Sequence, residues 1–322
     1  MKILANDGIE KSAQLKLESA GFTISVEKIQ QEKLAEAINE NNFSVLLVRS
    51  ATQVRKNVID ACPNLKLIGR GGVGMDNIDV EYARSKGIKV INTPAASAFS
   101  VAELVFAHLF SMARFIYDAN REMPVKGEMN FNDLKKKYGK GIELRGKTLG
   151  IIGIGSIGQI VAKYALGCGM KVIAYDPFVK EATIDVEIFG AKNVSIKINT
   201  IPLNDVLAQS DFITLHVPKQ KDGKAVIGND ELNKIKKGGC IVNTSRGGII
   251  DESALIEALN TGKIAHAALD VFVNEPTPKK EVLQHPKISL TPHIGAATAE
   301  AQERVGSELA QQIIEWALVV AR

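Results

Sequence analysis

Three residues in the C-terminal half of the chain could act together on a carboxylic acid. Arg246 follows the apolar run "CIVNT", Glu275 lies just beyond "ALDVF", and His293 stands in "ISLTPHIGAAT". A guanidinium offers parallel donors to a carboxylate, and an imidazole exchanges protons near neutral pH. A carboxylate on the second ring nitrogen fixes the tautomer of the imidazole. Considered alone, His293 is more simply a packed loop residue, so its role depends on the other motifs.

A glycine pattern in "LGIIGIGSIGQIVAKYA" indicates dinucleotide binding. The pattern Gly153-x-Gly155-x-x-Gly158 closes an apolar run and opens a helical one, which is the context that this motif needs. Gly153 permits a tight turn, Gly155 lets the backbone approach a pyrophosphate, and Gly158 lets helix and strand pack closely. The amides of Ser156 and Ile157 would face the anion at the start of the helix.

The next apolar run, "KVIAYD", ends in Asp176, 18 residues after Gly158. An acid at about this spacing binds the ribose hydroxyls of a dinucleotide. Its charge would repel a 2′-phosphate, which favours NAD over NADP. The alternative is a structural glycine turn followed by an unrelated aspartate. With a dinucleotide beside an arginine and an acid/base pair, the chain would be equipped to move hydride to or from a 2-hydroxy acid. In that setting His293 is predicted to be catalytic.

The elements that must position these residues are short apolar runs alternating with longer amphipathic segments, a pattern that predicts parallel sheets with helical crossovers. The strands expected in a first sheet are 2–6, 22–26, 44–48, 66–69 and 88–91. The strands expected in a second, larger sheet are 147–155, 170–176, a strand near 194–198, 211–217, 239–244, 264–272 and 287–292. The candidate residues would lie at the carboxyl ends of strands, where doubly wound folds bind ligands.

The fold class predicted is α/β, with a Rossmann NAD-binding domain and a flavodoxin-like substrate-binding domain, each a doubly wound parallel sheet. Residues 97–122 are expected to form one long apolar helix that links the domains and contributes to a homodimer contact, and 123–147 a loop. The last segment is expected to be a helix that packs back on the first domain. The predicted domains are 1–98 plus 295–322 for substrate and 99–294 for NAD.

Composition excludes several classes of protein. A chain of 322 residues that is 45% hydrophobic and 24% charged is typical of a globular protein with two domains. The net charge of +4 is too small to imply nucleic-acid binding. The basic run "LKKKYGK" (134–140) is either a solvated loop or helix end, or an anion contact. The N-terminus is charged too early for a signal peptide, and no apolar stretch is long enough for a membrane span, so a cytoplasmic location is expected.

Metal and disulfide chemistry is not expected. Cys62, Cys168 and Cys240 are far apart and form no CxxC pair, and Cys240 is predicted to be a core residue. No group of histidine, cysteine or acidic residues has the spacing of metal ligands. Among the other histidines, His108 is predicted to be a core or interface residue, and His216 either lines the adenosine side of the cofactor site or has no role there.

The chain resembles the D-isomer-specific 2-hydroxyacid dehydrogenases over nearly its whole length. The stretches that carry the resemblance are "GRGGVGMDNIDV", "NTPAASAFSVAEL", "GKTLGIIGIGSIG", "NTSRGGIIDESAL", "AALDVFVNEP" and "TPHIGAAT". Together they are very specific. The stretches "VRSATQV" (48–54) and "GRGGVGMDNID" (69–79) are most similar to the branch that oxidises 3-phospho-D-glycerate.

The resemblance implies roles for matching positions. Arg246 would orient the substrate through its carboxylate and C2 oxygen, His293 would be the acid/base, and Glu275 its carboxylate partner. The residues expected to contact NAD are Val73, Gly153, Gly155, Ser156, Ile157, Gly158, Asp176, His216, Val217, Pro218, Thr244, Ser245, Arg246, Asp270, His293, Gly295 and Ala296. Those expected to contact the substrate, a small anionic 2-hydroxy or 2-keto acid, are Arg49, Ser50, Arg70, Gly72, Val73, Arg246 and His293.

Some alternatives stay open at this point. Arg49 and Arg70 could instead form surface salt bridges, and "GRGGVG" could be only a flexible turn. Gln53 stands where this branch can carry a basic residue, and 180–200 is longer than the family pattern. No regulatory domain is expected after the last helix. The leading function is NAD-dependent oxidation of 3-phospho-D-glycerate. The alternatives are a dehydrogenase for lactate, glycerate or glyoxylate, and an NAD-sensing binding protein.

Overall fold

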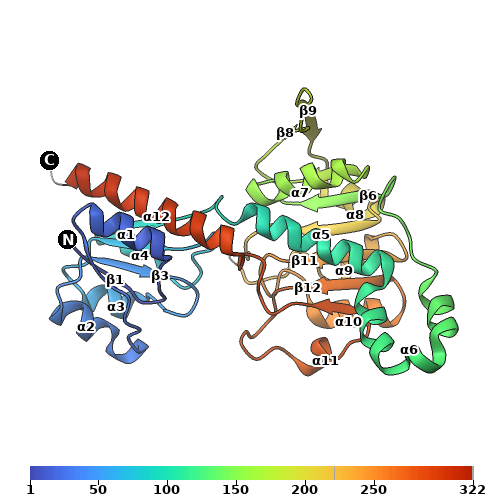
Figure 1. Cartoon of the computed structure of the whole chain (residues 1–322), viewed down its shortest axis with the longest axis horizontal. Helices are drawn as coiled ribbons and strands as arrows, with labels where there is room; N and C mark the ends of the chain where they lie inside the picture. The colour runs from blue at the N-terminus through green and yellow to red at the C-terminus, as the bar shows by residue number, and fades with distance from the viewer. Residues whose placement is uncertain (221, 321–322) are drawn as a thin grey trace. The chain divides into compact units, whose positions relative to one another are not determined.

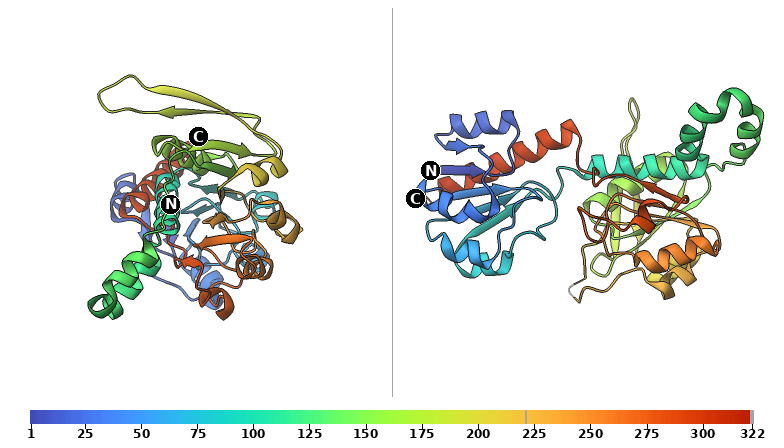
Figure 2. Two further views of the ribbon diagram at one scale, coloured as in Figure 1. Left: turned by 90° about the vertical axis from the view of Figure 1, so that its right-hand side faces the viewer. Right: turned by 90° about the horizontal axis from the view of Figure 1, so that it is seen from below.

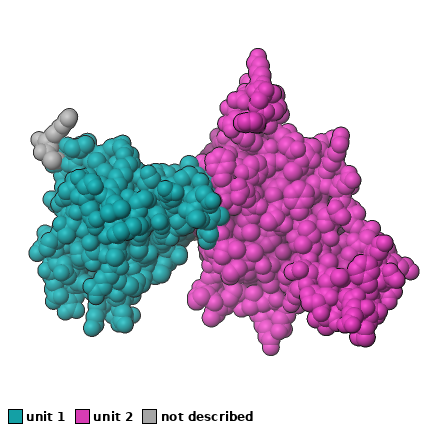
Figure 3. Space-filling view, viewed as in Figure 1, with its two compact units in different colours: residues 1–98, 296–322 teal, residues 99–295 magenta. Residues whose placement is uncertain are grey.

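The chain folds into two compact units (Figure 3). The structure is a computed structural model that describes residues 1–220 and 222–320. One unit comprises Met1–Ala98 and the segment from Ala296 onward, and the other is Phe99–Gly295. The chain leaves the first unit after Ala98 and returns to it at Ala296.

The first unit is built on a five-stranded parallel sheet with the order β2-β1-β3-β4-β5 (Figure 1). This is the flavodoxin-like order. The strands are β1 (Lys2–Ala5), β2 (Thr23–Ser25), β3 (Val45–Val48), β4 (Leu67–Arg70) and β5 (Lys89–Asn92). The helices are α1 (Lys11–Ser19), α2 (Leu34–Glu40), α3 (Lys56–Ala61) and α4 (Val80–Ser85), with a short 3₁₀ turn, η1 (Gln31–Lys33). All five predicted strands are present.

Alternate residues of these strands enter two cores, one on each face of the sheet. Leu46 and Ile68 pack with α2, α3 and α4, whereas Val45 and Leu67 pack with α1 and α12 (Ala299–Val320). A Cβ on Gly306 would lie 2.9 Å from the Cβ of Ala13. Glycine at this position therefore lets α12 pack closely on α1, and the last helix lies where the sequence predicts.

The second unit is built on a six-stranded parallel sheet with the order β13-β12-β11-β10-β6-β7. Its strands are β6 (Thr148–Ile152), β7 (Lys171–Tyr175), β10 (Phe212–Leu215), β11 (Gly239–Asn243), β12 (Ile264–Leu269) and β13 (Ile288–Leu290). One face packs against α5 (Ala98–Arg114) and α7 (Ser156–Gly167). The other face packs against α8 (Leu203–Gln209), α9 (Asn229–Lys234), α10 (Glu252–Asn260) and α11 (Lys280–Leu283). The doubly wound architecture predicted from the sequence is confirmed.

The strand predicted near 194–198 does not join this sheet, so that prediction is wrong. It is β9 (Val194–Asn199), which pairs antiparallel with β8 (Glu181–Val186) in a separate hairpin (Figure 2). Only Thr200 forms a parallel bridge to the main sheet, at Ala174. Ala182, Ile184 and Ile198 enter the core beside α7, while their strand neighbours Thr183, Asp185 and Lys197 are exposed. This alternation is typical of an antiparallel ribbon with one buried face.

The single helix predicted over 97–122 and the loop predicted over 123–147 are also wrong. Helix α5 ends at Arg114, and Phe115 adopts a left-handed conformation with φ +54°. A second helix, α6 (Ile116–Tyr138), then starts at an angle of 61°. The ring of Phe115 packs 6.2 Å from that of Tyr138 and 5.8 Å from that of His266. These tertiary contacts stabilise a bend that the continuous apolar pattern does not show.

Helix α6 persists through Pro124 and Gly127, which the sequence pattern treats as helix breakers. It has a local kink at Asn130. Glu122 accepts hydrogen bonds at 2.8 Å from both Lys126 and Lys137. The bond from Lys137, 15 residues away, links the first part of the helix to its last turn. Lys126, Lys137 and Tyr138 lower the pKa of Glu122 to about 2. The basic run at 134–140 is therefore the end of a helix, one of the two structures expected for it.

No single helix in the described part of the chain is long and apolar enough to cross a membrane. Helices α5 and α6 reach that length and hydropathy only as a bent pair. Much of the apolar surface of α5 lies in the core of the second unit, including Val105 and Leu109. Cys62 and Cys240 are buried, as predicted for Cys240.

Candidate active site

His293 and Glu275 form a hydrogen-bonded pair in the second unit. They lie in the loops that follow β13 and β12, which are adjacent strands paired at Leu290 and Leu269. The Nδ1 atom of His293 is 2.7 Å from Oε2 of Glu275, and both side chains are partly exposed. The other oxygen, Oε1, accepts from the backbone N–H of Phe272 at 2.8 Å. With Nδ1 held by the carboxylate, Nε2 of His293 is available to exchange a proton with a ligand.

A buried carboxylate fixes the backbone around His293. His293 has a φ of +55°, which is uncommon for a residue with a side chain. Asp270, with 1% of its surface exposed, accepts from the N–H of Ile294 at 2.8 Å and of Gly295 at 2.9 Å. It also accepts from the hydroxyl of Thr291 at 2.6 Å. Asp270 therefore clamps the loop on both sides of the histidine, a task that the sequence did not suggest for this predicted cofactor contact.

The loop that carries Glu275 is fixed from α10. Glu252 is buried, and its Oε1 accepts from the N–H of Val273 at 2.7 Å. A Cβ on Gly247 would lie 1.8 Å from the carbonyl oxygen of Phe272, so only glycine fits there. Sequence reasoning missed Glu252, because "GGIIDES" shows only the aspartate N-cap of a helix and not the contact with a loop 21 residues away.

Arg246 lies at the same edge of the sheet, in the loop after β11, which neighbours β12. The side chain of Asn243 accepts from the N–H and hydroxyl of Ser245 and donates to the carbonyl oxygen of Arg246 at 2.9 Å. The turn is thus rigid, and the half-buried arginine belongs to the edge that carries Glu275 and His293.

The glycine motif has the geometry that a dinucleotide requires. Gly153 has a φ of +96°, and a Cβ there would lie 2.5 Å from the carbonyl oxygen of His216. A Cβ on Gly158 would lie 2.1 Å from the carbonyl oxygen of Gly153. At Gly155 a Cβ would meet nothing within 4 Å, which leaves open space at the start of α7. The residues present therefore fit a pyrophosphate at the N-terminus of α7.

Asp176 follows β7 and faces this loop. Its Oδ2 accepts from the N–H of Ile154 at 3.0 Å, and its Oδ1 accepts from the N–H groups of Phe178 and Val179. The carboxylate is half-buried and fixed beside the glycine turn. Because a carboxylate oxygen has two lone pairs, Oδ2, which accepts only one of these bonds, can still accept from a hydroxyl group.

His216 follows β10 and is neutral. Its Nε2 lies 3.0 Å from the hydroxyl of Thr214, and its Nδ1 is buried with no hydrogen-bond partner among the described residues. Burial lowers the pKa of His216 to about 3. Val217 and Pro218 follow it, and Thr244 occupies the equivalent place after β11, so these predicted cofactor contacts all lie at the carboxyl edge of the second sheet.

The first unit carries the other predicted substrate residues on the loops after β3 and β4. Arg70 pairs with Val48 in the sheet, and Arg49 is the residue after Val48, so the two arginines lie at neighbouring strand ends. The N–H of Arg49 donates to Asp7 at 2.7 Å, and the guanidinium donates to Gln302. Ser50 is exposed beside it.

The turn after Arg70 is equally fixed. Gly72 has a φ of +131° and donates its N–H to the hydroxyl of Thr93 at 2.8 Å. The carbonyl of the exposed Val73 accepts from Asn92 at 2.7 Å. The turn is therefore held by side chains from the end of β5 and the residue that follows it.

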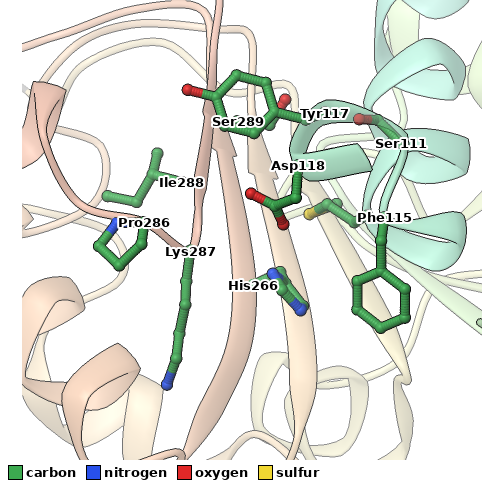
Figure 4. Close-up of a pocket in the computed structure, with 10 residues that line it drawn as sticks. Ser111, Phe115, Tyr117, Asp118, His266, Pro286, Lys287, Ile288 and Ser289 are labelled. Carbon is green, nitrogen blue, oxygen red and sulfur yellow. The ribbon is translucent and has the colours of Figure 1, made fainter. Parts of the chain in front are cut away.

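A small cavity elsewhere in the second unit is not a substrate site. Phe115, Asp118, His266 and Lys287 line it beside the α5–α6 bend (Figure 4). Its volume of about 10 Å³ is that of roughly one water molecule. Within residues 1–220 and 222–320, no three histidine, cysteine or acidic side chains are grouped so that they could hold a metal ion.

The chain belongs to the D-isomer-specific 2-hydroxyacid dehydrogenase family, and it is an NAD-dependent enzyme of that family. Residues 106–295 match the family model described as the D-isomer specific 2-hydroxyacid dehydrogenase, NAD binding domain. The chain is 44% identical over 318 residues to a hydroxypyruvate reductase from Thermotoga maritima, covering 98% of this chain and 97% of that protein.

Two further relatives carry the name of another activity. The chain is 44% identical over 313 residues to a D-3-phosphoglycerate dehydrogenase from Methanocaldococcus jannaschii, covering 97% of this chain and 57% of that protein. The chain thus spans little more than half the length of that relative. The structure of an NAD⁺-bound 3-phosphoglycerate dehydrogenase from Entamoeba histolytica superposes with a TM-score of 0.76 at 30% identity, covering 99% of this chain and 95% of that one.

Replacing Asp176 with alanine is expected to weaken NAD binding and relax discrimination against NADP. If Asp176 has the role expected from the sequence, the change removes an acceptor for ribose hydroxyls and a charge that repels a 2′-phosphate. A charge-assisted contact is worth about 1.5–3 kcal/mol. Its loss predicts that the ratio of kcat/KM for NAD to kcat/KM for NADP falls about tenfold to hundredfold. Asp176→Asn keeps an acceptor but removes the charge, so it separates the loss of ribose binding from the loss of repulsion. A wild-type protein that uses both cofactors equally well would show that Asp176 does not select NAD.

Proposed function

We propose that this enzyme oxidises 3-phospho-D-glycerate to 3-phosphohydroxypyruvate with NAD, a reaction that serves serine biosynthesis. The observation that carries the proposal is the pair of arginines, Arg49 and Arg70, at neighbouring strand ends of the first unit. A phosphate at neutral pH carries nearly two charges and three acceptor oxygens, so it favours more than one cationic donor. The name of the Methanocaldococcus jannaschii relative supports this substrate.

The residues at the edge of the second sheet would perform the acid–base work. Arg246 binds the substrate carboxylate and the C2 oxygen. Nε2 of His293 removes the C2 hydroxyl proton in oxidation and returns it in reduction, while Glu275 holds Nδ1 and stabilises the imidazolium. Bound NAD supplies the hydride acceptor. Exchange of a proton at a fixed imidazole is worth roughly two to four orders of magnitude in rate.

The remaining assignments form part of the same proposal. Residues 99–294 bind NAD, and 1–98 with 295–322 bind the substrate, the latter through Ser50, Gly72 and Val73 besides the two arginines. The enzyme works in the cytoplasm as a homodimer through the helix region 97–122, and the contact extends along α6. Apolar side chains on α6 that lie at least half exposed support such a contact. They are Ile116, Val125, Met129 and Phe131.

Reduction of hydroxypyruvate is the second candidate. The chain matches the Thermotoga maritima hydroxypyruvate reductase over 97% of that protein's length. In addition, Gln53 is uncharged at a position where a basic residue could contact a phosphate. Lactate and glyoxylate are further possible substrates of the same chemistry. The expected alternative of an NAD-sensing binding protein is set aside, because the family is one of NAD-dependent dehydrogenases and a sensor does not need a histidine–glutamate pair held at 2.7 Å.

Replacing Arg70 with alanine is expected to separate the two leading substrates. KM for 3-phosphohydroxypyruvate should rise about tenfold to hundredfold, the worth of one charge-assisted contact. KM for hydroxypyruvate, which lacks the phosphate, should change much less. The phosphate effect should weaken as salt is added, because part of the attraction is long-range.

The control for this measurement is Arg84→Ala. Arg84 is an exposed arginine of the same unit that pairs with Glu81 on its own helix, and its removal should leave both KM values unchanged. Equal losses on both substrates in Arg70→Ala would assign Arg70 a structural role and favour the hydroxypyruvate alternative.

A further inference from the structure

His108 is a buried histidine that the proposed chemistry does not use. It lies on α5 with 3% of its surface exposed. Its Nδ1 is 3.0 Å from the hydroxyl of Ser289 on β13, and its Nε2 is 3.1 Å from the hydroxyl of Thr291 just beyond that strand. Both ring nitrogens are therefore satisfied by hydroxyls more than 180 residues away in the sequence.

The direction of each hydrogen bond follows from the chain of partners. Thr291 donates its hydroxyl proton to Oδ1 of Asp270, because an ionised carboxylate only accepts. Thr291 can then only accept from His108, so Nε2 carries the proton. Nδ1 accepts from Ser289 in the neutral ring. Burial lowers the pKa of His108, an effect that the charge of Asp270 offsets in part, so the ring stays neutral.

This series of hydrogen bonds, from His108 through Thr291 to Asp270, ends at the loop that carries His293. Asp270 accepts from the N–H groups of Ile294 and Gly295, the two residues that follow His293. We propose that His108 is a positioning residue, which acts through Thr291 and Asp270 to hold the loop of His293 in its left-handed conformation. The catalytic part of this inference rests on the proposed role of His293 as acid/base.

The chemistry of the site favours this role over simple core packing. An apolar side chain of similar volume would fill the position on α5 without the cost of burying an imidazole. It would also leave Thr291 without its donor and the charge of Asp270 less well stabilised. Ser289 also lines the small cavity beside the α5–α6 bend (Figure 4).

The test compares His108→Leu with His108→Gln. Glutamine offers an amide donor toward Thr291 and a carbonyl acceptor toward Ser289, so it can replace both bonds. In His108→Leu, hydrogen–deuterium exchange of the peptide 291–298 should speed up about fivefold to tenfold, the worth of roughly one hydrogen bond. With NADH and 3-phosphohydroxypyruvate, kcat should fall about tenfold at nearly constant KM, since small misplacements of a reacting group are costly. In His108→Gln, the exchange rate of 291–298 and kcat should both return most of the way to their wild-type values.

Leu109→Ala is the matched control, because Leu109 is fully buried on the same helix and has no polar link to the loop. It should lower Tm while leaving exchange at 291–298 and kcat close to wild type. Should His108→Leu not fold, Thr291→Val interrupts the same path and should speed the same exchange.

Two results would overturn the positioning role. The first is that His108→Leu and Thr291→Val both keep the wild-type exchange rate of 291–298 and the wild-type kcat. The second is that Leu109→Ala changes this exchange rate and kcat as much as His108→Leu does. The proposed function fails separately, through full activity of His293→Ala. The exchange data still decide whether His108 holds the loop in that event.

Discussion

Replacing His293 with alanine is expected to lower kcat by roughly two to four orders of magnitude, the usual contribution of general acid–base catalysis. The affinity for NAD should remain close to wild type, because most residues expected to hold NAD, including the glycine turn and Asp176, lie at β6 and β7 and not at β13. Steady-state kinetics with NADH and 3-phosphohydroxypyruvate give kcat, and isothermal titration calorimetry gives the affinity. Glu275→Gln should lose less, because it weakens the hold on Nδ1 without removing the imidazole.

His285→Ala is the control for this experiment. His285 is also a loop histidine of the second unit, but its Nε2 faces Asn260 at 3.3 Å, outside the proposed site. It should retain wild-type kcat. Near-wild-type turnover in His293→Ala would remove His293 from the mechanism.

Replacing Gly158 with alanine is expected to disrupt cofactor binding. The new Cβ would lie 2.1 Å from the carbonyl oxygen of Gly153, a backbone atom that cannot move without displacing the turn. Loss of one charge-assisted hydrogen bond to the pyrophosphate predicts a fall in NAD affinity of about tenfold to hundredfold, and loss of two predicts more. Calorimetric titration with NAD measures the change.

Gly167→Ala offers a matched comparison on the same helix, because a Cβ there would meet nothing within 4 Å. It should bind NAD as the wild-type protein does. Unchanged NAD affinity in a folded Gly158→Ala variant would mean that the turn does not hold the pyrophosphate.

The strands of both sheets could be predicted from the sequence because buried parallel strands are short apolar runs separated by helical patterns. The errors arose where tertiary contacts decide the structure. The left-handed Phe115 is stabilised by Tyr138 and His266, and neither contact is visible as a local pattern. The β8–β9 hairpin was missed because its alternation was treated as one more parallel strand.

The candidate site shows the same division. The glycine motif and the pair of His293 and Glu275 have local signatures, and the structure brings the latter two to 2.7 Å. Glu252 and His108 have no such signature. They act through loops 21 and 183 residues away in the sequence, so only the folded chain reveals them.

A competition experiment tests the proposed function most directly. The wild-type enzyme is given limiting NADH with equal concentrations of 3-phosphohydroxypyruvate and hydroxypyruvate, and mass spectrometry measures the two products. Their ratio equals the ratio of the two kcat/KM values. If Arg49 and Arg70 bind a phosphate, 3-phosphoglycerate should exceed glycerate by at least about tenfold, the worth of one charge-assisted contact. An excess of glycerate would contradict the proposal and identify hydroxypyruvate as the preferred substrate.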